Sequence, residues 1–149
     1  MSEVSLLSQL NPEVEPVTTP TVALDIKPED IVPERTSPAW SDYVMKQFEE
    51  DELMDGNPTV DGLRRVSLKL VGDIVESTCH VIQAPIPAND FSATVEHTIV
   101  FELRPGFQKM FREVADVNVL NCEAEFRRFA TSTASTRAEA RALRKALML

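Results

Sequence analysis

The chain has 149 residues and a formal net charge of −9, and 43% of its residues are apolar. This length is enough for one domain with its own core, or for a smaller domain with a tail. No uninterrupted apolar run approaches the roughly 20 residues that cross a bilayer, and the first residues lack the basic start and apolar stretch of a secretory signal. The composition therefore excludes a membrane-spanning protein, and we expect a cytoplasmic protein with no membrane partner.

The charge is unevenly distributed along the chain. Residues 1–60 contain 13 acidic and 3 basic residues, whereas residues 61–149 contain 11 acidic and 12 basic residues. The acidic balance therefore belongs to the N-terminal part. It does not argue against nucleic acid as a partner of the rest.

The N-terminal part divides into an arm and a helix. Residues 1–38 hold six of the ten prolines and show no sustained helical or strand period, which predicts an acidic, largely disordered arm. In residues 39–55, the apolar side chains of Trp40, Val44 and Phe48 recur at every fourth position, which predicts an amphipathic helix. The arm has three interpretations: a solubilising tail, a segment that folds over the basic face and competes with nucleic acid, or a segment that binds a protein partner together with the Trp40 helix.

A second helix and three strands follow. Residues 60–71 are predicted to form a helix, because Leu63, Val66 and Leu70 fall on one face of it. Strands are predicted for three segments with apolar and polar residues in alternation, namely residues 74–82, 91–103 and 111–120. The connections between them are of hairpin length and contain turn residues such as Pro105-Gly106.

The last segment, residues 133–149, carries the most distinctive pattern. It is predicted to be a helix that can begin at Thr136, where a capping box with Glu139 is possible, or earlier, because residues 132–135 offer other caps. Its basic side chains fall within an arc of roughly 100° at 3.6 residues per turn, and they are Arg137, Arg141, Arg144 and Lys145. The order of these predicted helices and strands indicates an α+β fold, in which a three-stranded antiparallel meander is covered on one face by helices.

Two stretches resemble the Rad-fifty-two-type single-strand annealing proteins of homologous recombination. The run Val-Asp-Gly-Leu-Arg at residues 60–64 is similar to the entry to the family's helix before the sheet. The run Ala-Glu-Ala-Arg-Ala-Leu-Arg-Lys-Ala-Leu at residues 138–147 is similar to the family's long helix with its basic pair. The resemblance covers about residues 58–149, which it identifies as an annealing-like, nucleic-acid-binding core of helix-β-β-β-helix order.

The resemblance implies a groove that holds the backbone of single-stranded DNA. Carried over residue by residue, the groove cations are Arg64, Arg144 and Lys145. The family's further basic residue, three places after the pair, is Met148 in this chain. Family members assemble into rings or filaments, so the resemblance also implies a homo-oligomer.

We therefore predict single-stranded DNA binding and annealing of complementary strands, without covalent catalysis. Arg137, Arg141 and Arg65 are expected to support the three groove cations, because several cations in register are needed to hold a phosphate backbone. One alternative is a protein-interaction or transcription-regulating adaptor that acts through the arm and the Trp40 helix. Another is a binder of structured RNA or of duplexes.

Other chemistry is less well supported by the sequence. Cys79 and Cys122 have no CxxC spacing and are expected to be reduced, buried thiols. There is no phosphate-binding loop or dinucleotide motif, so no cofactor is expected. By its place in the strand pattern, His97 is expected to be a hydrogen-bonded core histidine rather than a base.

Two further groups of residues have competing interpretations. Glu96, Glu113 and Asp116 are the candidates for a magnesium-dependent nuclease site, which we consider improbable. Phe126 and Phe129 flank Arg127 and Arg128, and they either stack bases or anchor a polar loop in the core. We expect the second.

Overall fold

The computed structural model describes residues 31–149. The predicted arm over residues 1–38 therefore lies mostly outside the described residues. Its last part is described and contacts the folded chain: a turn joins the Ser37 N–H to the Glu34 carbonyl, and Arg35 donates to the carbonyl of Leu70. The folded part thus begins a few residues before the predicted boundary.

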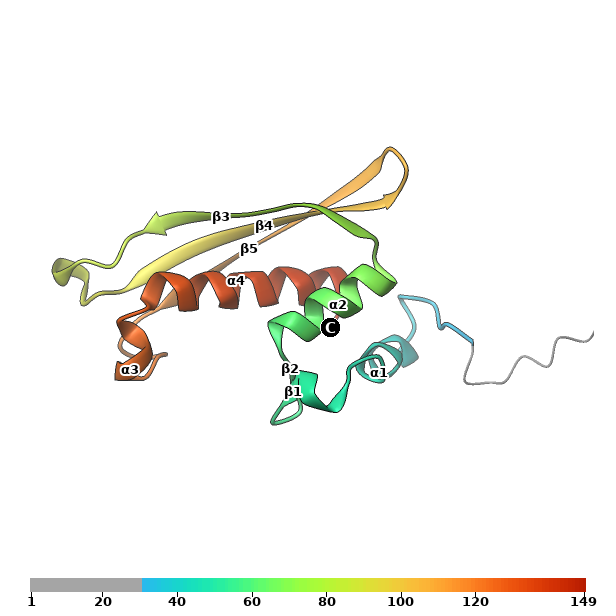
Figure 1. The fold of residues 1–149 in the computed structure, drawn as a ribbon, viewed down its shortest axis with the longest axis horizontal. Coiled ribbons are helices and arrows are strands. Elements are labelled where there is room, and N and C mark those ends of the chain that lie inside the picture. The colour runs from blue at the N-terminus through green and yellow to red at the C-terminus, as the bar shows by residue number, and fades with distance from the viewer. Residues whose placement is uncertain (1–30) are drawn as a thin grey trace, which may run out of the picture. The chain divides into compact units, whose positions relative to one another are not determined.

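The three predicted strands form one antiparallel sheet in the order β3-β4-β5, as expected (Figure 1). They span Asp73–Gln83 (β3), Ala93–Arg104 (β4) and Phe107–Val117 (β5). The last strand begins four residues before the predicted start at Phe111, because Arg104 pairs with Phe107 and leaves Pro105-Gly106 as a two-residue turn. Gly106 has a φ of +77°, which a glycine adopts without strain.

Helices cover one face of this sheet, as the predicted α+β fold requires. Helix α4 (Ala130–Leu147) packs on β4 and β5, and helix α2 (Val60–Leu70) packs on α4 (Figure 1). A column of small side chains lets α4 approach the strands closely, and its members are Ala130, Ala134, Ala138, Ala142 and Ala146. The strand β3 is left as an edge strand whose residues are nearly all exposed.

Helix α4 begins at Ala130, which is before Thr136 and also before the earlier caps considered at residues 132–135, so both predicted starts were wrong. The Thr136 hydroxyl donates to the carbonyl of Ser132 one turn earlier, so it is used inside the helix rather than as a cap. Packing of Ala130 and Ala134 against Ala93, Val95 and Val117 explains why the polar run before Thr136 is helical. Tertiary burial here outweighs the low helix propensity of serine and threonine.

The predicted helix over residues 39–55 is shorter than expected. Helix α1 covers Ala39–Met45, and it is followed by a 3-10 helix (Glu50–Glu52) and a short hairpin of β1 (Leu53–Met54) and β2 (Asn57–Pro58). Phe48 nevertheless joins the core, as do Trp40 and Val44. The indole N–H of Trp40 donates to the carbonyl of Leu147 at 2.6 Å, so the first helix is fixed to the end of the last one.

Two further features complete the described part of the chain. A one-turn helix, α3 (Ala124–Arg127), precedes α4 and was not predicted. Within residues 31–149, the helices are all too short or too polar to cross a membrane.

Candidate nucleic-acid interface

Three of the predicted cations form a row along α4 at intervals of four residues. Arg137 donates to the carbonyl of Asn121 at 2.9 Å, Arg141 donates to the carbonyl of Val114 at 2.7 Å, and Lys145 pairs with Glu113 at 2.5 Å. All three therefore border β5 and the loop that follows it. The row extends over about 12 Å at a rise of 1.5 Å per residue.

The acceptors differ in charge along this row. Arg141 and Arg137 bind backbone carbonyls and, in the case of Arg137, also the side-chain oxygen of Asn121 at 3.2 Å. These neutral acceptors fix the guanidinium groups but leave their positive charge uncompensated. Lys145, in contrast, is neutralised by the carboxylate of Glu113. The uncompensated charge on this side of α4 is therefore that of the two arginines.

Two of the three cations of α2, Arg64 and Arg65, are neutralised, whereas Lys69 binds the neutral side chain of Gln47. Arg64 forms an ion pair with Glu139 on α4. Arg65 forms an ion pair with Glu52 at 2.5 Å, and it also donates to the carbonyl of Gln47. The Arg65 guanidinium lowers the pKa of the Glu52 carboxyl to about 2, and a backbone hydrogen bond from Glu49 adds to the effect. These two arginines therefore join elements of the fold.

The structure separates the three cations that the family resemblance assigned to one groove. Arg64 lies against Glu139, which is about 120° around α4 from Lys145 and about 140° from Arg144 at 100° per residue. Arg144 points towards β2, where it donates to the carbonyl of Pro58 at 3.5 Å. Its Nε is buried and has no hydrogen-bond partner among the described residues. Of these three cations, Arg144 is the one bound to a neutral acceptor.

A cleft of about 510 Å³ adjoins the arginine row at Arg137, and Asp55 is the one carboxylate among its lining residues. It is bounded by the β1–β2 hairpin, the start of α2 and the middle of α4, through residues that include Asn57, Thr59, Thr136, Arg137 and Ala140. Thr59 caps α2, where its hydroxyl accepts from the N–H of Gly62. The positive end of the α2 dipole therefore contributes to the same cleft as Arg137.

The expectation that His97 is a core residue is confirmed. Its side chain is 6% exposed, and Nε2 lies 2.9 Å from the hydroxyl of Ser77. Burial lowers the pKa of His97 below its ordinary value. Its Nδ1 has no partner among the described residues, so no carboxylate orients the ring as a base would require.

The carboxylates considered for a metal site have separate partners. Glu96 pairs with Arg112 at 3.5 Å and Glu113 pairs with Lys145, while Asp116 accepts hydrogen bonds from the side chains of Asn118 and Asn121. Over residues 31–149 there is no group of three or more His, Cys, Asp or Glu side chains that could hold a metal ion.

The prediction of two buried thiols was wrong for Cys79. Both cysteines are free, but Cys79 is exposed and Cys122 is partly buried. The physical reason is that α4 covers β4 and β5 and leaves both faces of the edge strand β3 accessible. The alternation pattern of β3 did not reveal which strand would lie at the edge.

The expectation that Phe126 and Phe129 anchor a polar loop in the core was also wrong. Phe126 is 51% exposed and Phe129 is 58% exposed, on and just after the short helix α3. The guanidinium of Arg128 lies 5.3 Å from the centre of the Phe129 ring. A third phenylalanine, Phe91, is 54% exposed in the connection between β3 and β4. Its exposure was not predicted, because the residue continues the apolar alternation of β4.

No protein-family model, no curated protein and no solved structure matches this chain.

Proposed function

We propose that this protein binds single-stranded DNA through the outer side of α4 and promotes annealing of complementary strands. The observation that carries the proposal is the arginine pair Arg137 and Arg141, held in place by neutral acceptors so that their charge remains uncompensated. A phosphate oxygen is a stronger acceptor for a guanidinium than a carbonyl, because the bond is charge-assisted. The two side chains are therefore oriented in advance for an anionic ligand.

The spacing suits a backbone ligand. Residues four apart in a helix are separated by about 6 Å along the axis, which is comparable to the distance between successive phosphates of an extended strand. Arg144, which also binds a neutral carbonyl, adds a further uncompensated charge to α4. Contacts to phosphates carry no sequence information, and they leave base edges free for a second strand, as annealing requires.

The family resemblance to annealing proteins supports the same function, and it is compatible with the α+β core of the described residues. It also supports a homo-oligomer, for which the edge strand β3 offers a surface. Val75, Val81 and Ile82 are 48%, 40% and 55% exposed on this strand. Long exposed edges with apolar side chains are the part of a sheet that another chain pairs with most readily.

The adaptor alternative loses one of its two elements. Trp40, Val44 and Phe48 are 4%, 0% and 9% exposed, so the apolar stripe of α1 packs in the core and is not free to dock a partner. Residues 1–30 of the acidic arm lie outside the described residues, and a protein partner for the arm remains a prediction. Binding of duplexes or structured RNA is separated from single-strand binding by the experiment below.

The test is an annealing assay with two complementary labelled strands, combined with binding measurements on single strands, duplexes and RNA hairpins. The informative variant is Arg137→Gln/Arg141→Gln, because glutamine retains a donor for the same carbonyls and removes the charge. Lys46→Gln/Lys69→Gln is a matched control that also removes two charges. Lys69 binds a neutral acceptor, Gln47, but lies on α2, and Lys46 is an exposed residue at the end of α1.

We expect the wild-type protein to prefer single strands and to accelerate annealing. The control double variant should retain both properties, and the arginine double variant should lose most of them. Equal loss in both double variants would show that only net charge matters. Absence of binding by a folded wild-type protein at low salt would refute the proposal.

A further inference from the structure

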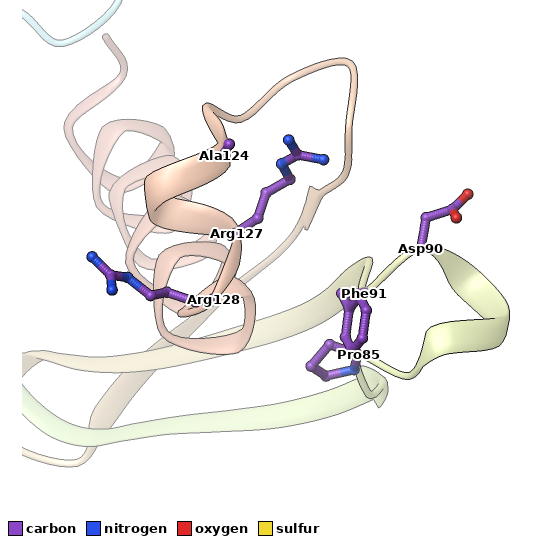
Figure 2. A pocket seen from close by; sticks show the side chains of 6 residues that line it. All are labelled: Pro85, Asp90, Phe91, Ala124, Arg127 and Arg128. Carbon is purple, nitrogen blue, oxygen red and sulfur yellow. The ribbon is translucent and has the colours of Figure 1, made fainter.

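A second cavity lies at the other end of α4, away from the C-terminal part of the cationic row. Its volume is about 480 Å³, within the range of small-molecule sites. The connection between β3 and β4 supplies one wall and helix α3 supplies the other (Figure 2). The side chains that line it are Pro85, Asp90, Phe91, Ala124, Arg127 and Arg128.

The aromatic wall is fixed rather than loose. The N–H of Phe91 donates to the carbonyl of Ile86 at 3.0 Å, and the side chain of Asn89 bonds both the N–H of Ile86 and the carbonyl of Ala84 at 3.0 Å. Asp90 and Phe91 both adopt left-handed backbone conformations, with φ of +53° and +57°. Such conformations are unfavourable for a bulky residue and persist only where the surroundings impose them. The connection thus holds a phenylalanine ring outside the core.

The opposite wall is cationic. Among the residues that the structure describes, neither Arg127 nor Arg128 forms an ion pair, and the Nε of Arg127 is buried with no hydrogen-bond partner. Arg128 donates to the backbone carbonyl of Glu125, which is neutral. Its guanidinium lies over the ring of Phe129, and in Figure 2 it points away from Phe91 and Asp90. Arg127 is therefore the cation that this wall offers, and Asp90 is the one carboxylate among the lining residues. The buried Nε of Arg127 favours a ligand with an anionic, hydrogen-bond-accepting group.

We infer that this cavity is a stacking site for one nucleotide of the bound strand, with its base on Phe91 and its phosphate on Arg127. The inference rests on the proposed function and adds a base contact to a surface that otherwise holds only phosphates. An aromatic face accepts any base, which keeps binding independent of sequence. Asp90 at the rim can accept a hydrogen bond from an N–H group, and every DNA base carries at least one.

An apolar peptide side chain suits the cavity less well than a nucleotide. It would cover the ring of Phe91 but would bury Arg127 and Asp90 without partners, and burial of unpaired charge is costly. A nucleotide satisfies the three groups at once, because it has a planar ring, an anion and hydrogen-bond donors. Capture of a peptide instead is an outcome that the experiment detects.

The test compares a single strand that carries all its bases with one from which bases have been removed. A single strand containing the fluorescent base 2-aminopurine reports stacking by quenching, and a strand with abasic sites removes the base while keeping the phosphates. The variants are Phe91→Leu, which keeps an apolar side chain without an aromatic face, and Phe91→Tyr, which restores the ring. Phe107→Leu is the matched control: Phe107 is 50% exposed and lies 5.1 Å from Arg104, but it is at the opposite end of the sheet.

We expect Phe91→Leu to weaken binding of the normal strand about fivefold or more, as loss of one stacked base does. The salt dependence of binding by Phe91→Leu should be the same as that of the wild type. Phe91→Tyr and Phe107→Leu should bind like the wild type, and the abasic strand should not distinguish Phe91→Leu from the wild type. Arg127→Gln should instead reduce the slope of log K against log salt by about 0.7, the value for one phosphate of a single strand.

The outcomes separate this inference from the proposed function. Normal binding by Phe91→Leu, without loss of 2-aminopurine quenching, would overturn the stacking site and leave the α4 interface intact. Binding of an apolar peptide that Phe91→Leu abolishes, and that the oligonucleotide does not displace, would also overturn it. Failure of the wild type to bind any strand would refute both. Thermal melting of each variant establishes that it is folded.

Discussion

Replacing Trp40 with phenylalanine tests whether the first helix is part of the core. Trp40 is 4% exposed, and its indole N–H donates to the carbonyl of Leu147, the last residue of α4, at 2.6 Å. Phenylalanine fills most of the same space but leaves that carbonyl without a donor. An unsatisfied buried acceptor costs about 1–3 kcal/mol, and the smaller ring leaves a gap that adds to this cost. We expect the free energy of unfolding to fall by about 2–3 kcal/mol.

The measurement is urea unfolding followed by circular dichroism. The midpoint should fall while the slope m is unchanged, because the same surface is exposed on unfolding. Tyr43→Phe is a suitable control, since Tyr43 packs against Trp40 with ring centres 5.7 Å apart but is only partly buried. A loss below about 0.5 kcal/mol, no greater than a surface substitution, would contradict the packing of α1. It would also mean that the Trp40 helix is free to bind a partner, as the adaptor interpretation requires.

Three further predictions concern stability. Gly72→Ala should destabilise the fold by at least about 2 kcal/mol, because Gly72 has a φ of +152° and an added Cβ would lie 2.2 Å from the carbonyl oxygen of Glu102. Urea unfolding measures the loss of stability. An unchanged unfolding midpoint would contradict the close approach of Gly72 to Glu102. Burial lowers the pKa of His97 in the folded state below its ordinary value of 6.5. The contribution of the neutral His97 to stability should therefore be complete above pH 6.5 and should fall as the pH drops below 6.5. His97→Gln should flatten this part of the stability profile, and an unchanged profile would refute the prediction. The pKa of Glu52 is lowered from 4.5 to about 2, first by Arg65 and then by the backbone N–H of Glu49. The contribution of Glu52 to stability should therefore be complete above pH 4.5 and lost as the pH falls towards 2. Arg65→Gln should reduce that acid-dependent loss, and an identical acid profile in the variant would argue against the ion pair.

The sequence predicted the sheet well because its signal is local. The alternation in β4 places Val95, His97, Ile99 and Phe101 on the buried face, and the turn at Pro105-Gly106 fixes the hairpin that follows. The helix α2 was equally well predicted, since the apolar residues of its buried face lie within one short segment. Local patterns of this kind determine element type before any tertiary contact is known.

The errors arose where long-range packing decides the outcome. The early start of α4 depends on Ala130 and Ala134 fitting against strands far away in the sequence. The short α1 depends on a chain reversal after Met45 that lets Glu52 reach Arg65. In the candidate site, the basic arc of α4 could be predicted from the spacing of its residues. The charge of each acceptor could not, because Glu113 and Val114 belong to β5, a different element of the fold.

The exposed phenylalanines are the other feature that the sequence did not reveal. Phe91 continues the alternation of β4, yet its left-handed backbone turns it out of the strand. Phe126 and Phe129 have the spacing of one helical turn, but α3 is too short to bury them. A period shows which side chains share a face, and only the tertiary structure shows whether anything covers that face.

The most direct test of the account is the salt dependence of single-strand binding by the wild type and by Arg137→Gln/Arg141→Gln. Each phosphate contact contributes about 0.7 to the slope of log K against log salt for a single strand. We predict that the double variant lowers the magnitude of the slope by about 1.4, and that Lys46→Gln/Lys69→Gln leaves it nearly unchanged. A slope that is the same in the wild type and the arginine variant would contradict the claim that α4 holds the phosphate backbone.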